Sequence, residues 1–289
     1  MRCKTLAVFA CLTLGAVGLM AQQTRLKVFI SIDMEGLAGV VTNSDVTPTS
    51  PDYPHFRTIM AGEANAAVDG AFLAGATEVL VRDGHGSKQN LLPGDVNPRA
   101  RLLRGQSVGP KNMMEGIDKS FGAVVFVGYH AKAGTPNAIL EHTSTGNVVD
   151  LSINGVSLPE AGYNAMVAGL YDVPVVFIAG DRAVVDQVRG LLGPIEGVAV
   201  KEEIGDASNG MSPKRAQEDI RQLVAKAVQN RAKMKPYKIP GPYTMVLKVK
   251  MERPLIMPLR PLAFRRWPDR SATWPLTSPR TRCCWTAGR

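Results

Sequence analysis

Cysteine is absent from the body of this sequence. The only four are Cys3, Cys11, Cys283 and Cys284, so residues 22–251 contain none. This absence excludes a thiolate metal site and a cysteine nucleophile from that part of the chain. It also excludes a disulfide framework, which a chain of 289 residues does not need because it can bury a large core.

Excess positive charge is also absent from the body of the chain. The net charge of +9 comes from Arg2, Lys4 and residues 252–289, which together account for all but one of these charges. Hydrophobic residues make up 45% of the chain and charged residues 20%, as in ordinary globular proteins. We therefore expect no nucleic-acid partner, because a basic surface is the usual indication of one.

The chain also lacks an apolar run long enough for a transmembrane helix. Arg2 and Lys4 precede an apolar stretch at residues 6–19, and Ala21 follows as a small residue. A membrane span needs about 20 apolar residues, whereas a secretory signal peptide has a charged start, a shorter apolar stretch and a small residue at its cleavage site. We therefore predict a signal peptide at residues 1–21, a secreted or periplasmic protein, and no stable membrane association after cleavage. A membrane anchor is the alternative.

Lysine is missing from residues 252–289, whose composition differs from that of the body. They hold six Pro, eight Arg and all three Trp of the chain. A basic, Trp-containing segment on a membrane surface is one interpretation, but the prolines exclude a helix of useful length. We interpret this stretch as an aberrant tail that arises from out-of-frame translation of a GC-rich gene. The folded domain is then expected at residues 22–251.

Apolar strand-like segments alternate with helix-like segments from Leu26 to about Glu203. This alternation predicts an α/β fold, a three-layer sandwich with a largely parallel sheet and helices on both faces. Residues 150–158 are typical of a hairpin around an Asn-Gly turn. We expect helices at residues 57–74, 162–170, 182–192 and 212–232, and strands at residues 27–32, 78–82, 123–127, 173–179 and 243–250.

Three of the predicted strands end in residues that can bind a metal ion. The first strand is followed by Asp33 and Glu35, the second by His85 and the third by His130. The carboxyl ends of parallel strands meet at one crevice of an α/β sheet, so we expect these side chains to converge there. Asp, Glu and His without Cys are the ligand set of a hydrolytic zinc site.

Each of these residues also has an ordinary structural interpretation. The two carboxylates after the first strand can form ion pairs, although Gly36 would let the backbone approach an ion closely. His85 can be an incidental member of a turn built by Asp83, and His130 can be hydrogen-bonded in the core. In the metal-site interpretation, Asp83 accepts the second ring N–H of His85 or shapes its turn.

Two further candidates come from outside the strands. His142 lies in a polar loop, where a solvent-exposed histidine is the ordinary interpretation; near a metal ion it could polarise a carbonyl or carry a proton. Glu160 directly precedes a predicted helix, where the helix dipole favours a carboxylate in any case. Only the company of the other candidates makes Glu160 a candidate ligand. Ser144 lacks the Gly-x-Ser-x-Gly elbow of serine hydrolases.

Six short motifs follow one another along the chain: Ser31-Ile32-Asp33-Met34-Glu35-Gly36, Met60-Ala61-Gly62-Glu63-Ala64-Asn65, Asp83-Gly84-His85, Met114-Glu115-Gly116, Gly128-Tyr129-His130-Ala131 and Glu160-Ala161-Gly162-Tyr163-Asn164-Ala165. In this order they resemble the M55 family of zinc D-aminopeptidases, over about residues 26–250. The resemblance implies an α/β fold and a dinuclear centre with two zinc ions per subunit. It also implies a homo-oligomeric ring, which is a decamer in the family.

The resemblance further implies that five residues bind zinc and that His142 is catalytic. The five are Asp33, Glu35, His85, His130 and Glu160. In the pattern of the family, Asp33 bridges the two ions, Glu35 and His130 share one ion, and the remaining two residues hold the other. Pro159 departs from the pattern, because the family usually has Gly before the glutamate.

The activity implied by the resemblance is hydrolysis of short peptides or amides with N-terminal D-amino acids by a metal-activated water. Two other functions stay open. A non-catalytic peptide-binding component of a dipeptide uptake system would have an apolar pocket without metal. A metal amidase or esterase of other specificity would use the same ligands. Zinc content and a screen of D- and L-aminoacyl amides would separate the three.

Overall fold

The computed structural model of the protein describes residues 25–250 and 283–286. The predicted signal peptide lies outside the described residues, as does the predicted tail apart from the last of these ranges. Among the helices of the described part, none is both long enough and apolar enough to cross a membrane.

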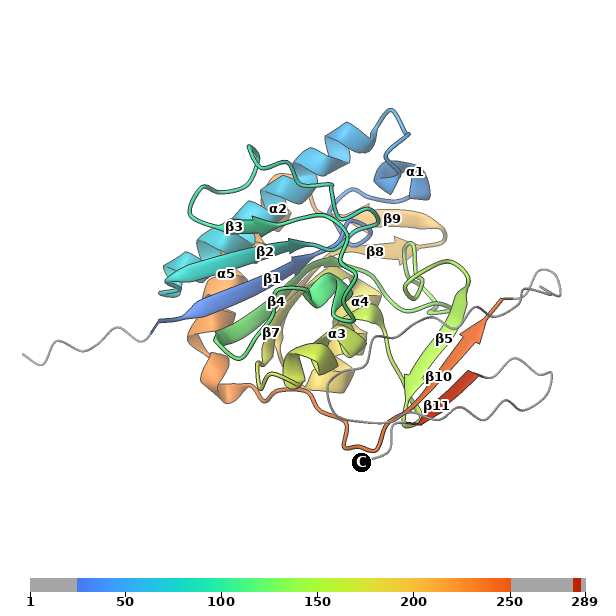
Figure 1. The fold of residues 1–289 in the computed structure, drawn as a ribbon. Coiled ribbons are helices and arrows are strands. Elements are labelled where there is room, and N and C mark those ends of the chain that lie inside the picture. The colour runs from blue at the N-terminus through green and yellow to red at the C-terminus, as the bar shows by residue number, and fades with distance from the viewer. Residues whose placement is uncertain (1–24, 251–282, 287–289) are drawn as a thin grey trace, which may run out of the picture.

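A seven-stranded sheet forms the centre of the molecule (Figure 1). All neighbouring strands pair in parallel except the last two, β8 and β9, which are antiparallel. In spatial order the strands are β3 (Arg101–Leu103), β2 (Glu78–Asp83), β1 (Lys27–Ile32), β4 (Phe121–Tyr129), β7 (Val175–Asp181), β8 (Glu196–Ile204) and β9 (Ala207–Gly210). The predicted α/β fold with a largely parallel sheet is confirmed.

Helices cover both faces of this sheet (Figure 1). On one face lie α2 (Tyr53–Leu73) and α5 (Pro213–Gln229), and on the other lie α3 (Glu160–Gly169) and α4 (Arg182–Leu192). Because β1 is covered on both faces, Val28, Phe29 and Ile30 are all fully buried instead of alternating with exposed residues. The shorter helical turns are α1 (Asn43–Val46), η1 (Asn112–Met114) and η2 (Arg231–Lys233).

The four predicted helices are all present; α4 has the predicted ends, and the other three have shifted ends. The first begins at Tyr53, before the predicted start, and the last ends at Gln229, before the predicted end. Asp181 caps α4 as its side chain accepts a hydrogen bond from the backbone N–H of Val184 at 3.2 Å. An oxygen at this position satisfies a helix N–H group that otherwise has no partner.

A second, antiparallel sheet lies beside the large one (Figure 1). Its order is β11 (Cys283–Thr286), β10 (Thr244–Val249), β5 (Val148–Ile153) and β6 (Val156–Ser157). The last two strands form the predicted hairpin, and Asn154 and Gly155 at its turn have φ angles of 50° and 82°, as such a turn requires. β11 belongs to the tail predicted to be aberrant, and the origin of that tail stays a prediction.

The strand order brings three predicted strand ends together. β1 lies between β2 and β4, and the chain continues outward from β2 in one direction and from β4 in the other. The border between β1 and β4 is therefore the switch point of the sheet, where ligands of α/β proteins bind beyond the carboxyl ends of the strands.

The turn after β1 packs directly on the end of β4. The N–H of Gly36 donates to the carbonyl of Gly128 at 2.8 Å, and a Cβ atom on Gly36 would lie only 1.8 Å from the carbonyl oxygen of Tyr129. Gly36 is therefore needed for the close approach of two backbone segments. This contact explains the glycine by packing alone, and the expected close approach of the backbone to an ion stays a prediction.

Candidate metal centre

The side chains predicted from the three strand ends converge in the structure. Asp33 and Glu35 follow β1, His85 follows β2 and His130 follows β4, and the three strands are neighbours in the sheet. Asp33, Glu35 and His130 are 3%, 6% and 0% exposed. Buried carboxylates are rare without a partner, so a group of them at the switch point indicates a site built for charge.

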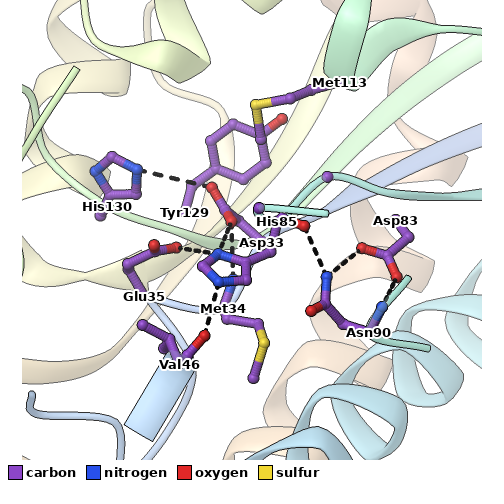
Figure 2. A network of polar contacts seen from close by, with 12 residues as sticks. Asp33, Met34, Glu35, Val46, Asp83, His85, Asn90, Met113, Tyr129 and His130 are labelled. Atoms are coloured by element: carbon purple, nitrogen blue, oxygen red, sulfur yellow. Dashed lines mark hydrogen bonds and ion pairs between the residues drawn. The ribbon is translucent and has the colours of Figure 1, made fainter. Parts of the chain in front are cut away.

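His85 faces both carboxylates that follow β1 (Figure 2). Its Nδ1 atom lies 3.2 Å from Oδ1 of Asp33 and 3.1 Å from Oε2 of Glu35. Its Nε2 atom lies 3.0 Å from the carbonyl oxygen of Val46, which can only accept a hydrogen bond. Nε2 therefore carries a proton, and Nδ1 is the ring atom available to the site.

His130 approaches Asp33 from the opposite side (Figure 2). Its Nε2 atom lies 3.7 Å from Oδ2 of Asp33 and 3.5 Å from Oε1 of Glu160. Its Nδ1 atom donates to the carbonyl of Ala131 at 2.9 Å. Nε2 is buried and has no hydrogen-bond partner among the described residues, which is uncommon for a buried polar atom. The expectation of an ordinary core histidine therefore explains only one of its two ring nitrogens.

His142 and Glu160 complete this side of the site. Nδ1 of His142 donates to the carbonyl of Leu140 at 2.9 Å, and Nε2 lies 3.7 Å from Oε1 of Glu160. The ring of His142 stacks on that of His130, with centroids 3.8 Å apart and planes 12° apart. The side chain of His142 is 26% exposed, so this histidine lies between the buried cluster and solvent.

Two parts of the site can now be named. We call Glu35 and His85 the Glu35 half, and His130, His142 and Glu160 the Glu160 half. Asp33 lies between them, with Oδ1 toward the first half and Oδ2 toward the second.

The residues present fit a metal ion. Asp33, Glu35 and His130 form one group whose ligand atoms lie within 4.8 Å of one another, and His130, His142 and Glu160 form another. In each of the three histidines, one nitrogen donates to a backbone carbonyl and the other faces carboxylates, the arrangement that orients histidine ligands. Carboxylate oxygens with imidazole nitrogens suit zinc. The unpartnered Nε2 of His130 is the atom that most requires such a partner.

The charges of the site shift the pKa values of its histidines and of Glu35. Burial lowers the pKa of His85, but the carboxylates of Glu35 and Asp33 outweigh it and raise the pKa to about 11. Burial likewise lowers the pKa of His130, and Glu160 with the other carboxylates raises it to about 10. Burial raises the pKa of Glu35, but its histidine neighbours hold it below its usual value. Without a metal ion the cluster therefore holds protons, which metal binding would release.

The structure pairs the candidate ligands differently from the pattern that the resemblance implied. Glu35 and His130 do share a group with Asp33. His85, however, contacts Glu35 and not Glu160, while Glu160 contacts His130 and His142. The direct contacts between side chains therefore run within each half, and the expected sharing of one ion by His85 and Glu160 stays a prediction.

Asp83 shapes the turn of His85 without touching its ring. Its carboxylate accepts hydrogen bonds from the backbone N–H groups of Asn90 and Leu91, at 2.6 and 2.8 Å, and from the Asn90 side chain at 2.8 Å. The Asn90 side chain also donates to the carbonyl of His85 at 2.7 Å (Figure 2). Of the two roles expected for Asp83, the structure shows the second.

A cavity of about 480 Å³ adjoins both halves of the site, with Glu35 and His142 in its wall. Apolar atoms come from Val41 and from residues 138–140. Three more carboxylates line it, those of Glu141, Glu203 and Asp206, and no Lys or Arg is among its lining residues. The sequence did not indicate these residues, because a cavity forms from segments that are far apart along the chain.

Lys201 is a further residue that the sequence analysis missed. It lies on β8, is 2% exposed, and donates from Nζ to the carbonyl of Glu35 at 2.5 Å. Two glutamates follow it in the sequence, a pattern that is typical of an exposed strand end.

His55 is the one histidine of the chain outside the site. It lies on α2, with its ring against Phe56.

Comparison with known proteins agrees with this site. Residues 26–255 match the family model of peptidase M55, described as D-aminopeptidase. A D-aminopeptidase of Bacillus subtilis (strain 168) is 38% identical over 212 residues, which cover 73% of this chain and 77% of that protein. The solved structure of the zinc-dependent D-aminopeptidase DppA from Bacillus subtilis, a self-compartmentalizing protease, matches with a TM-score of 0.75 and 36% identity. That match covers 78% of this chain and 81% of the other. The chain therefore belongs to the peptidase M55 family.

Proposed function

We propose that this protein is a zinc-dependent D-aminopeptidase that hydrolyses short peptides or amides with N-terminal D-amino acids. Its family and the names of its relatives support the activity. The observation that carries the proposal is the buried Nε2 atom of His130, which has no hydrogen-bond partner in the described part of the chain and faces the carboxylates of Asp33 and Glu160. A bound cation satisfies that nitrogen and offsets the charge of the carboxylates.

We assign the ligands of two zinc ions by the contacts within each half. Glu35 and His85 would hold one ion, and His130 and Glu160 the other. Asp33 would bridge them, because its two oxygens face opposite halves. Zinc in such a site supplies Lewis acidity, which polarises a carbonyl and makes water more acidic.

His142 is the residue that we assign to proton transfer. The carbonyl of Leu140 fixes the proton on Nδ1, so Nε2 can accept a proton from a reacting water or give one to a leaving amine. Its partial exposure at the wall of the cavity gives a substrate access to this atom. Ring stacking on His130 holds its imidazole beside the proposed ligands without requiring that it bind a metal ion.

The cavity supports a small peptide as the substrate. Its volume of about 480 Å³ suits a ligand of a few residues. The carboxylates of Glu141, Glu203 and Asp206 line it without a cation among its lining residues. A free N-terminal ammonium group is therefore favoured over a blocked terminus, as an aminopeptidase requires.

Export and assembly complete the proposal. Residues 1–21 support a secreted or periplasmic location. Because the Bacillus subtilis structure is that of a self-compartmentalizing protease, we propose that this chain also forms a homo-oligomer, arranged as a ring and possessing ten subunits as the family pattern implies.

One experiment tests the activity and the role of His142 together. The purified protein is analysed for bound metal and assayed on matched D- and L-aminoacyl amides, alongside a His142→Ala variant. We expect two zinc ions per chain in both proteins and hydrolysis of the D-amides by the wild type. The variant should be slower by about 10²–10⁴-fold, the usual contribution of a general acid or base.

Each contrary result has a distinct meaning. A wild-type protein that binds peptides, binds no zinc and hydrolyses none of the amides would be a peptide-binding component of an uptake system. Hydrolysis of L-amides or esters in preference to D-amides would make it a metal amidase or esterase of other specificity. Full activity in the variant would remove His142 from the mechanism.

A further inference from the structure

Lys201 reaches the metal centre across two intervening strands of the sheet. β8, which carries it, is separated from β1 by β7 and β4 (Figure 1). Nζ nevertheless donates to the carbonyl of Glu35 at 2.5 Å and to the carbonyl of Val40 at 2.5 Å. The two carbonyls lie at the two ends of residues 35–40, the segment that follows β1. A single ammonium group thus ties that segment to the far side of the sheet.

The burial of this ammonium group is costly. Lys201 is only 2% exposed, so its ammonium group has lost most of its contact with water. No carboxylate of the described residues lies within ion-pair distance of Nζ, so its shown hydrogen bonds go to carbonyl groups. A buried charge without a close ionic partner is destabilising in most proteins. The presence of a buried lysine here therefore indicates a role beyond packing.

The same segment is held from a second direction. The carboxylate of Glu63, on α2, accepts a hydrogen bond from the N–H of Ala38 at 2.9 Å. Glu63 thus fixes the middle of the segment, and Lys201 fixes its ends. Of these two residues, Lys201 is the one that bonds to the backbone of a candidate ligand, Glu35, whose side chain lies 3.1 Å from His85.

We propose that Lys201 is a positioning residue for the metal centre. By holding the peptide group of Glu35, its ammonium group directs the Glu35 carboxylate toward Asp33 and His85, and so sets the affinity of the Glu35 half for its ion. The proposal rests on the proposed function in so far as that ion is zinc. It concerns the backbone under the ligand and assigns Lys201 no contact with the substrate.

The test separates this role from a contribution to folding alone. Lys201→Met keeps the apolar stem and removes the donors, and Lys201→Arg keeps donors for both carbonyls. Val224→Ala is the matched control, because Val224 is fully buried on α5 and carries no candidate ligand. For each full-length protein, the zinc affinity is measured by competition with a chromophoric chelator, and the melting temperature of the metal-free form is measured separately.

We expect Lys201→Met to weaken the binding of one zinc ion by about 10- to 100-fold, the usual effect of removing a group that supports a ligand. Val224→Ala should lower the melting temperature and leave both zinc affinities unchanged, and Lys201→Arg should recover much of the lost affinity. If Lys201→Met does not fold, Lys201→Gln, which keeps one donor group, is measured in its place.

Two results would overturn the proposal. One is a Lys201→Met protein, or its Gln substitute, that melts earlier but binds both zinc ions as tightly as the control. The other is a Lys201→Arg protein no better at binding zinc than Lys201→Met. A wild-type protein that binds no zinc would instead overturn the proposed function, and this positioning role with it.

Discussion

The two halves of the centre use the same kinds of ligand but are held in different ways. In the Glu35 half, a buried ammonium group and a buried carboxylate hold the segment after β1, through Lys201 and Glu63. In the Glu160 half, backbone N–H groups hold the candidate ligands in place. Glu160 accepts from the N–H of Ser144 at 2.6 Å, and the N–H of His142 donates to the carbonyl of Ala131 at 3.2 Å.

This difference follows from where the ligands lie in the fold. The Glu35 half is built on two neighbouring parallel strands, so a residue of the same sheet can reach it. The Glu160 half joins a strand end to a helix start and a loop, and the loop must fold back over its own strand. We infer that the first half depends on buried charge and the second on the conformation of residues 131–145.

The largest expected effect comes from changing Asp33, the residue that the two halves share. Asp33→Asn keeps the size of the side chain but removes its charge and replaces one oxygen by an NH₂ group. We expect the loss of both zinc ions and a fall in activity well beyond about 100-fold, since even groups that only support a ligand change metal affinity or activity by about 10- to 100-fold. Elemental analysis and the D-amide assay would measure both.

Asp172→Asn is a matched control for this change. Asp172 has a φ of 62°, a conformation that asparagine also adopts readily, and its exposed carboxylate pairs with Lys238. Zinc content and activity should stay at the wild-type level in the control. An Asp33→Asn protein that keeps both ions would show that the halves are independent sites without a bridge.

A smaller effect is expected from removing one histidine of each half. His85→Ala should lose the ion of the Glu35 half and His130→Ala that of the Glu160 half, so each variant should retain about one zinc ion per chain. Both should lose most of their activity, because a dinuclear centre needs both ions to hold the attacking and leaving groups. Zinc content against protein concentration checks the stoichiometry. Loss of both ions in either variant would contradict the division into halves.

The strands and the ligands at their ends could be predicted from the sequence. β1, β2 and β4 are apolar runs that each stop at a polar residue, and parallel strands bring such ends to one edge of a sheet. That inference placed Asp33, Glu35, His85 and His130 in one cluster, as the structure shows. Their role as zinc ligands stays a prediction.

The remaining features depend on contacts that no local pattern encodes. Which oxygen of Asp33 faces which histidine is set by side-chain orientation, so the pairing within each half was not predictable. The contact between Lys201 and Glu35 joins residues 166 positions apart. Lys201 is also followed by polar residues, which are typical of an exposed strand end. His142 and Glu160 have no strong local signal of their own: they were candidates because other candidates accompany them, and the family resemblance supplied their roles.

The smallest expected effect concerns the buried carboxylate behind the Glu35 half. Burial raises the pKa of Glu63 to about 7 from 4.5, so between these pH values the folded protein holds a proton that the unfolded chain releases. The free energy of unfolding therefore falls as the pH rises from about 4.5 to 7, by on the order of 3 kcal/mol for a shift of this size. Glu63→Gln, which still accepts from the N–H of Ala38, should lose this part of the pH dependence.

Urea denaturation of the metal-free wild type and variant at several pH values between 5 and 7.5 measures the difference. The wild type should lose stability relative to Glu63→Gln as the pH rises. Glu218→Gln is the control, because the Glu218 carboxylate is exposed and its pKa lies below the usual value, held there by hydrogen bonds from Arg221 and Gln222. A constant difference between wild type and Glu63→Gln would mean that Glu63 is already ionised when folded. The Glu35 half would then be held by two opposite buried charges, those of Glu63 and Lys201, and its contrast with the Glu160 half would be stronger.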